Sequence, residues 1–135
     1  MVYSITMIQR SEIRAYVQRL AQEFNPDRVI LFGSYAHGKP TDDSDVDLLV
    51  IMNHGKKNVE QAISIDRRIN YSFPLDLLVR TPAEIKRRIA LRDVFLLSIL
   101  KQGRTIYERR GQRMAGEGRR RLRNGSPRVS SAKIA

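Results

Sequence analysis

The sequence predicts an α/β protein in which helices pack against a β-sheet. Short continuous apolar runs bounded by turn residues are typical of buried strands, and they occur at residues 29–32, 46–52 and 75–79. Apolar residues at helical spacing fill the stretches before, between and after these runs. The resulting order of helix, strand, loop, strand, helix, strand and helices is that of a sheet covered by helices.

The first third of the chain is expected to form one helix and one strand. Ser11 can cap a helix whose apolar residues recur on one face as far as Phe24, and Asn25-Pro26 ends it. The strand at residues 29–32 runs directly into Gly33-Ser34. A polar, acidic loop then leads to the second strand.

The helix that follows the third strand has a strong start signal. Thr81 can serve as its N-cap, Pro82 as its first helical residue and Glu84 as the returning partner of a capping box. Helical patterning also covers residues 58–70, and it continues beyond Leu91.

The end of the patterned region holds one more helix and one more strand. Residues 94–100 are the longest apolar stretch, and we expect a core helix there that ends at Gly103. Residues 105–107 are expected to form a short edge strand.

Length and charge divide the chain into a domain at residues 1–108 and a tail at 109–135. A chain of 135 residues favours one domain. The net charge is +11, of which the Arg-rich tail carries +8 and the first 108 residues +3. Because apolar content collapses in the tail, we expect disorder there. Nucleic acid is an expected partner only through this tail, which lacks aromatic residues for base stacking.

The composition also bears on cellular location. The chain has no cysteine, which suits a reducing cytosol. It has no signal peptide pattern and no apolar run near the length of about 20 residues that spans a bilayer. We therefore expect a cytoplasmic protein without a membrane partner.

Three aspartates are placed where they could hold a cation. Asp45 and Asp47 stand two residues apart at the start of a strand, so their carboxylates point to the same face. Asp76 opens the third strand and joins them if the two strands are neighbours. Adjacent carboxylates repel each other unless a cation lies between them, and magnesium prefers such oxygen ligands. Three carboxylates on adjacent strands suit a two-metal phosphoryl-transfer site.

Gly33-Ser34 supplies the complementary feature for a phosphate. A strand that ends in Gly-Ser and leads into a turn or short helix offers backbone N–H groups and a hydroxyl to phosphate oxygens.

Three other interpretations compete with a two-metal phosphoryl-transfer site. A solvated loop suits Asp42 and Asp43 but explains the three aspartates poorly. A calcium loop lacks its glycine, since Leu48 stands at that position, and it lacks its final glutamate. A P-loop fails at its last position, because Pro40 offers no hydroxyl and disturbs a starting helix.

These residues resemble a known family. Gly33-Ser34, ten residues, then Asp45-Val46-Asp47 matches the GS-x10-D-x-D motif of the DNA polymerase β-like nucleotidyltransferase superfamily. Residues 31–36, 44–50 and 74–79 are similar to its minimal nucleotidyltransferases, and the resemblance covers residues from about 10 to 108. One departure is His37, where family members often have arginine.

The resemblance implies a fold, a reaction and roles for five residues. The fold would be a mixed β-sheet like the polymerase β palm, and the reaction the transfer of AMP from ATP. Gly33 and Ser34 would hold the triphosphate, and Asp45 and Asp47 would bind two Mg²⁺ ions. Asp76 would complete the second metal site and help to deprotonate the acceptor hydroxyl.

The resemblance also implies a partner. Minimal nucleotidyltransferases are typically antitoxins that bind a HEPN-domain ribonuclease toxin and transfer AMP to one of its tyrosines. Two alternatives stay open. One is transfer to a small molecule such as an aminoglycoside, although those enzymes usually carry an additional helical domain. The other is a non-catalytic antitoxin that acts by binding alone.

Overall fold

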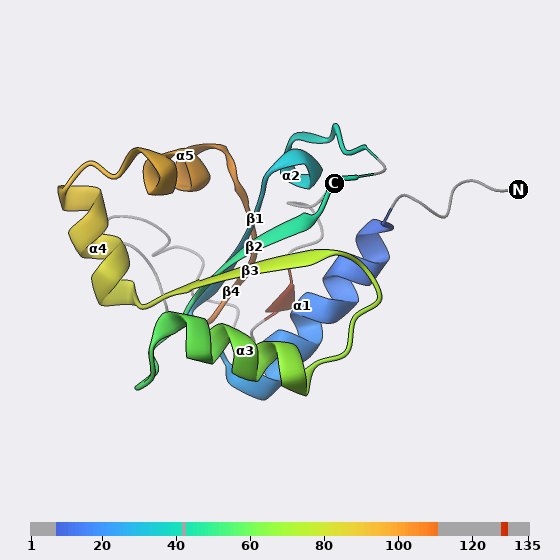
Figure 1. Cartoon of the computed structure of the whole chain (residues 1–135), viewed down its shortest axis with the longest axis horizontal. Helices are drawn as coiled ribbons and strands as arrows, with labels where there is room; N and C mark the ends of the chain where they lie inside the picture. Colours follow the sequence, from blue (N-terminus) through green and yellow to red (C-terminus); the bar gives the residue numbers. More distant parts are fainter. Residues whose placement is uncertain (1–7, 42, 111–127, 130–135) are drawn as a thin grey trace, which may run out of the picture.

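A mixed five-stranded sheet forms the centre of the molecule (Figure 1). The computed structural model describes residues 8–41, 43–110 and 128–129. The strand order is β3-β2-β1-β4-β5, with β2 and β3 parallel and the other neighbours antiparallel. The predicted α/β class with a mixed sheet is confirmed. The strands are β1 (Arg28–Phe32), β2 (Val46–Ile51), β3 (Leu75–Arg80), β4 (Arg104–Glu108) and β5 (Arg128–Val129).

Helices cover both faces of this sheet. Helices α1 (Arg10–Phe24) and α3 (Asn58–Arg68) pack on one face, and α4 (Pro82–Ala90) and α5 (Val94–Gln102) on the other (Figure 1). The short α2 (Ser34–His37) follows the end of β1. No helix in the described part of the chain is long and apolar enough to cross a membrane.

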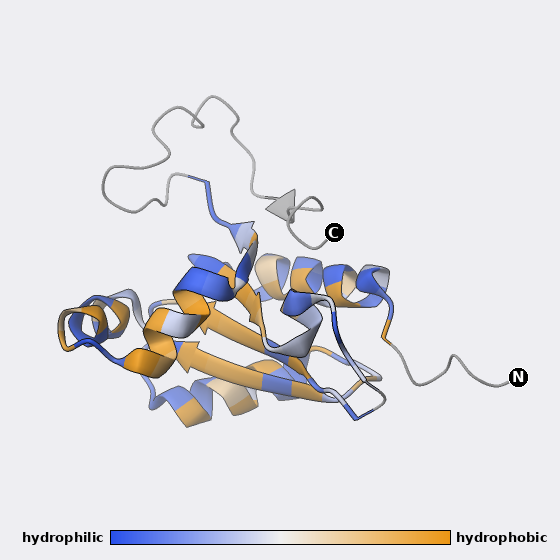
Figure 2. Cartoon of the chain, turned by 90° about the horizontal axis from the view of Figure 1, so that it is seen from above, coloured by the Kyte–Doolittle hydropathy of each residue, from blue (hydrophilic) through white to orange (hydrophobic). Residues whose placement is uncertain are grey.

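The two helical layers explain why the strands are apolar runs and do not alternate with polar residues. In β2, Leu48 and Val50 are buried against α1 and α3, while Leu49 and Ile51 are buried against α4 and α5. A strand buried on both faces has apolar residues at nearly every position, and Figure 2 shows the strands mostly orange. Asp47 interrupts this run, on the face that carries α4 and α5.

Side-chain caps fix the helix starts on that face. The Glu84 N–H donates to Thr81 Oγ1 at 3.2 Å, and the Thr81 N–H donates to the Glu84 carboxylate at 2.8 Å. The predicted capping box is therefore confirmed. Asp93 caps α5 in the same way, since its carboxylate accepts from the Leu96 N–H at 3.0 Å.

The predicted cap of the first helix is wrong. Ser11 lies inside α1, and the cap position is Gln9, whose N–H donates to the Glu12 carboxylate at 3.0 Å. A carboxylate three residues after the cap thus fixes the start, and the Ser11 hydroxyl is not needed for it.

The expected core helix at residues 94–100 is only half buried. Leu96 and Ile99 face the sheet, whereas Val94 and Phe95 are exposed. A helix on the outer surface of the fold buries only the face that it turns to the sheet.

Described residues beyond position 108 also contact the sheet. Arg109 is bound to the domain by an ion pair of 2.8 Å with Asp27, so the packed region extends past residue 108. Residues 128–129 pair with β4 as strand β5, so β4 is not an edge strand of this sheet. The other tail residues, 111–127 and 130–135, lie outside the described residues.

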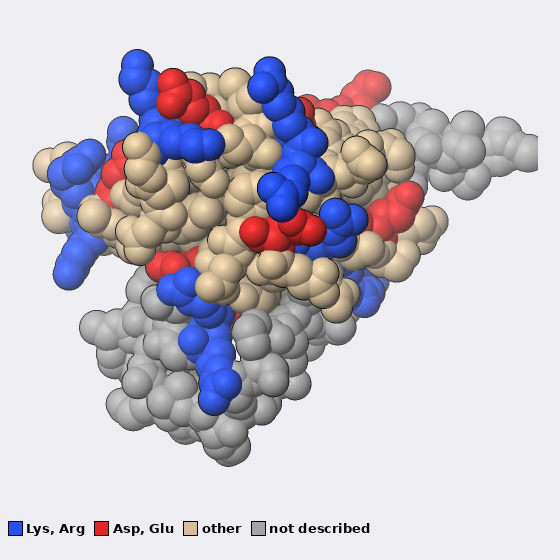
Figure 3. Space-filling view, turned by 90° about the horizontal axis from the view of Figure 1, so that it is seen from below, with Lys and Arg blue, Asp and Glu red and all other residues tan. Residues whose placement is uncertain are grey.

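The face formed by α1 and α3 carries charges of both signs (Figure 3). Glu23 lies 3.5 Å from Arg19 and 3.1 Å from Arg68. Exposed pairs of this kind contribute little stability. Because positive and negative side chains are mixed here, this face is not predominantly basic or acidic.

Replacement of Gly103 by alanine is expected to destabilise the fold by about 1–3 kcal/mol. An added Cβ would lie 2.5 Å from the Ile99 carbonyl oxygen and 2.7 Å from Ile30 Cγ2, at the passage from α5 into β4. The urea midpoint of unfolding measures the effect. Gly55→Ala is the control, because an added Cβ there meets nothing within 4 Å. Equal midpoints for the two variants would contradict this packing.

Candidate active site

Two of the predicted aspartates face each other across neighbouring strands. Asp47 of β2 is the register partner of Asp76 of β3. Parallel neighbours in register point to the same face, with backbones about 4.8 Å apart. Asp45 stands exposed just before β2, two residues from Asp47. The sheet therefore brings Asp47 and Asp76 together as predicted, and Asp45 adjoins them.

The pKa of Asp47 reflects the charges of the other two aspartates. The pKa of Asp47 is raised from 3.8 to about 6, first by partial burial and then by the charges of Asp76 and Asp45, in that order of importance. No ion pair with a lysine or arginine of the described residues neutralises any of the three. A carboxylate cluster without a cationic partner attracts cations.

Gly33 lies directly against this cluster. Its backbone has φ 78° and ψ −160°, a conformation that essentially only glycine adopts. A Cβ at this position would overlap Asp47 Oδ2. Glycine is thus required both by the backbone and by the neighbouring carboxylate.

Helix α2 presents backbone donors beside Gly33. The Ala36 and His37 N–H groups already donate to the Gly33 carbonyl, at 3.0 and 3.2 Å. The first-turn N–H groups of Ser34 and Tyr35 precede them and are the ones available to a phosphate oxygen. Ser34 is the first residue of α2, and its role in nucleotide binding stays a prediction.

Arg104 holds α2 in place, and the sequence did not reveal this. Its Nε donates to the Ala36 carbonyl oxygen at 2.7 Å across 68 residues of sequence. No local pattern connects the two positions. By contrast His37, which departs from the family pattern, is exposed at the end of α2 and is not placed among the carboxylates.

The donor chemistry of this cluster fits magnesium. Carboxylate oxygens are the protein ligands that Mg²⁺ prefers. Within the described residues, however, no three His, Cys, Asp or Glu side chains are already gathered in metal-binding positions. Asp47 and Asp76 are the pair best placed to hold an ion, and the two-metal assignment with Asp45 stays a prediction.

The structure also bears on the other interpretations. The Gly33–Lys39 segment is not a P-loop, because its helix ends at His37 and none begins at Pro40. Asp43 is an exposed loop residue as expected, and Asp42 lies outside the described residues.

Two other polar residues serve the packing. Tyr71 donates to Asp66 and packs edge-on against Tyr16, with ring centroids 5.8 Å apart. His54 Nδ1 accepts from the Lys56 N–H at 3.1 Å, and its Nε2 lies 2.8 Å from Asn58 Oδ1. Neither belongs to the carboxylate cluster.

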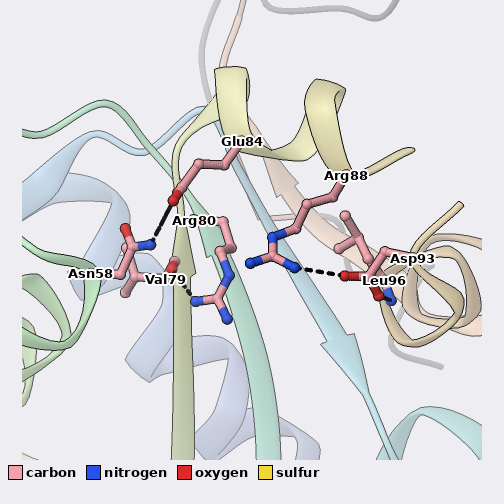
Figure 4. A network of polar contacts seen from close by, with 7 residues as sticks. All are labelled: Asn58, Val79, Arg80, Glu84, Arg88, Asp93 and Leu96. Atoms are coloured by element: carbon pink, nitrogen blue, oxygen red, sulfur yellow. Dashed lines mark hydrogen bonds and ion pairs between the residues drawn. The ribbon is translucent and has the colours of Figure 1, made fainter. Parts of the chain in front are cut away.

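Separate polar contacts fix the end of β3 that lies away from the aspartates and the turn between α4 and α5 (Figure 4). Asn58 Nδ2 donates to both Glu84 oxygens at 3.0 Å, which ties the start of α3 to the start of α4. Arg88 pairs with Asp93 at 2.9 Å across the turn between α4 and α5. These contacts hold α3, α4 and α5 at fixed positions on the sheet.

Comparisons with known proteins agree with this geometry. Residues 15–112 match the family described as Polymerase beta, Nucleotidyltransferase. A Methanocaldococcus jannaschii protein, provisionally named a protein adenylyltransferase, is 26% identical over 105 residues, which cover 75% of this chain and 100% of the relative. A second protein of that organism with the same provisional name is 40% identical over 63 residues, covering 47% of this chain and 63% of the relative.

A solved structure shares the fold. It is the crystal structure of a provisionally assigned nucleotidyltransferase from Sulfolobus solfataricus, with a TM-score of 0.54 and 21% identity. The match covers 78% of this chain and 85% of that one.

The stability of the metal-free protein is expected to depend on the ionisation of Asp47. Its pKa of about 6 in the fold, against 3.8 ordinarily, means that the folded state holds this proton more tightly than the unfolded chain does. Stability is therefore lost as the pH rises from about 4 to above 6. Asp47→Asn removes this loss, and it should raise the free energy of unfolding at pH 7.5 by about 1–2 kcal/mol after solvent screening.

Urea unfolding in EDTA at pH 4 and pH 7.5 tests this dependence. The gain from Asp47→Asn should be small at pH 4, and the exposed-loop variant Asp43→Asn should show no comparable gain at either pH. A gain from Asp47→Asn that is the same at both pH values would contradict the assignment.

Proposed function

The chain belongs to the polymerase β nucleotidyltransferase family, and from that membership we propose that it transfers AMP from ATP to a hydroxyl group of a partner protein. The observation that carries the proposal is the contact between Gly33 and Asp47. It sets a phosphate-binding turn directly against a pair of strand carboxylates. Phosphoryl transfer is catalysed mainly by such positioning and charge stabilisation.

The residues divide between binding and chemistry. The backbone around Gly33 and Ser34 would bind the triphosphate, and Asp45, Asp47 and Asp76 would hold Mg²⁺. When bound, Mg²⁺ would neutralise phosphate charge and make the attacking hydroxyl more acidic. That hydroxyl oxygen bonds to the α-phosphorus, Asp76 helps to take its proton, and the bond to the β-phosphate oxygen breaks, which releases pyrophosphate.

Two considerations favour a protein as the acceptor. The two archaeal relatives are both provisionally named protein adenylyltransferases. The motifs of residues 31–36, 44–50 and 74–79 resemble those of minimal nucleotidyltransferases. In that group the acceptor is typically a tyrosine of a HEPN ribonuclease toxin, which the transfer neutralises. We propose the same antitoxin role for this chain.

Label transfer from ATP tests the reaction. The protein is incubated with Mg²⁺ and the product of the neighbouring gene, which the proposal expects to be a HEPN-domain protein, with ATP labelled at the α-phosphate in one sample and at the γ-phosphate in the other. Label is expected on the HEPN protein from the α-labelled sample alone. Asp47→Ala should lower the rate at least about 100-fold, because metal binding supplies several kcal/mol of transition-state stabilisation.

The control is Asp43→Ala, which changes an exposed aspartate of the loop before β2 and should transfer label at the rate of the unchanged protein. Label transferred from the γ-phosphate would show kinase chemistry and would contradict nucleotidyl transfer. A tight complex without label in either sample would support neutralisation by binding alone and would overturn the proposed transfer.

A further inference from the structure

The turn that joins α4 to α5 exposes large apolar side chains. Ile89 is 38% exposed, Leu91 71%, Val94 79% and Phe95 58%, and all four lie within seven residues of sequence. We call these four residues the α4–α5 corner. Large exposed apolar patches on a soluble fold mark binding surfaces more often than chance exposure does.

The corner is held in shape by its own polar contacts. Arg88 pairs with Asp93 at 2.9 Å, and the other Asp93 oxygen accepts from the Leu96 N–H at 3.0 Å (Figure 4). Arg92 between the two helices has φ 61°, a left-handed conformation that costs free energy for a residue with a side chain. The exposed residues thus belong to a defined turn, and their exposure does not come from a frayed helix end.

The corner also adjoins the candidate active site. The Phe95 ring packs edge-on against Phe32, with centroids 6.1 Å apart and an interplanar angle of 83°. Phe32 is the residue before Gly33 and the register partner of Asp47 across β1 and β2. Directly opposed residues share a sheet face. A protein bound at the corner is therefore on the same face as the carboxylates.

The surroundings of the corner are basic. Residues 80–104 contain seven Lys or Arg residues and two acidic ones. One of those acids, Asp93, pairs with Arg88, and the other, Glu84, is bonded to Thr81 and Asn58. Lys86, Arg87 and Arg92 are exposed beside the apolar side chains. Charge complementarity therefore favours a partner with an apolar patch bordered by carboxylates.

We propose that the α4–α5 corner is the docking surface for the acceptor protein, which meets it with an apolar, acid-bordered patch and so presents its hydroxyl to the site beyond Phe32. The inference rests on the proposed function for the identity of this partner. It adds the surface that selects the acceptor, which none of the five predicted site residues provides.

Binding and transfer are measured separately to test this. The double variant Leu91→Glu/Val94→Glu is compared with Val59→Glu, which alters an apolar residue of α3 that is 65% exposed and lies away from the corner. Calorimetry gives the Kd for the neighbouring HEPN-domain protein, and fluorescence gives the Kd for a fluorescent ATP analogue. The double variant should bind the HEPN protein at least about tenfold more weakly and the analogue as tightly as the unchanged protein does. Val59→Glu should alter neither constant.

A charge variant tests the basic border. Lys86→Glu/Arg87→Glu should slow association with the HEPN protein and reduce its dependence on salt. An unchanged association rate would overturn the acidic character of the partner patch.

The outcomes distinguish this inference from the proposed function. Equal binding and equal label transfer by the double variant overturn the docking surface and leave the transfer intact. The second outcome is that the double variant loses the complex while even the unchanged protein transfers no label. This result supports the docking surface and refutes the transfer. The docking surface is also overturned if the unchanged protein forms no complex, or if the double variant loses only self-association or RNA binding.

Discussion

The contact between Gly33 and the Asp47 carboxylate is the constraint on which the rest of the site depends. Pairing of Phe32 with Asp47 brings the end of β1 level with the carboxylate. At that point the chain must turn away with φ 78°, and no side chain fits between the turn and Asp47 Oδ2. Helix α2 can therefore begin at Ser34, directly after the glycine that adjoins the Asp47 carboxylate. The Gly33–Ser34 backbone, a candidate phosphate ligand, therefore lies next to the Asp47 carboxylate, a candidate cation ligand.

This arrangement is held together by apolar packing, because its polar members repel one another. Asp47 is half-buried beside Asp76, and burial is the main cause of its raised pKa. The neighbouring β2 residues Leu48 and Leu49 are fully buried on opposite faces of the sheet. Their burial contributes roughly 1.5–3 kcal/mol per side chain, which offsets the cost of keeping carboxylates adjacent without a cation. The bonds among Thr81, Glu84 and Asn58 at the far end of β3 fix the starts of α3 and α4 without placing further charge near the site.

Local patterns in the sequence predicted the helices and strands. Contacts between residues far apart in the sequence could not be predicted from such patterns. The strand runs and the capping box at Thr81 depend on neighbours in sequence, and the structure confirms them. Asp47 and Asp76 could be paired because each stands near the start of an apolar strand. The Arg104 bond to Ala36 and the Arg109 pair with Asp27 join residues 68 and 82 positions apart, and no periodicity signals such contacts. The half-exposed α5 was missed because an apolar run does not show which of its faces has a partner.

Manganese binding tests the central claim most directly, because Mn²⁺ can replace Mg²⁺ at carboxylate and phosphate oxygens and is visible by electron paramagnetic resonance. The free Mn²⁺ signal is followed while the protein is added, with and without a non-hydrolysable ATP analogue. The account predicts that Mn²⁺ binding is strengthened by the analogue, and that Asp47→Asn weakens it at least about tenfold while Asp43→Asn does not. Equal Mn²⁺ binding by the Asp47→Asn variant and the unchanged protein would contradict a metal–nucleotide site on β2 and β3.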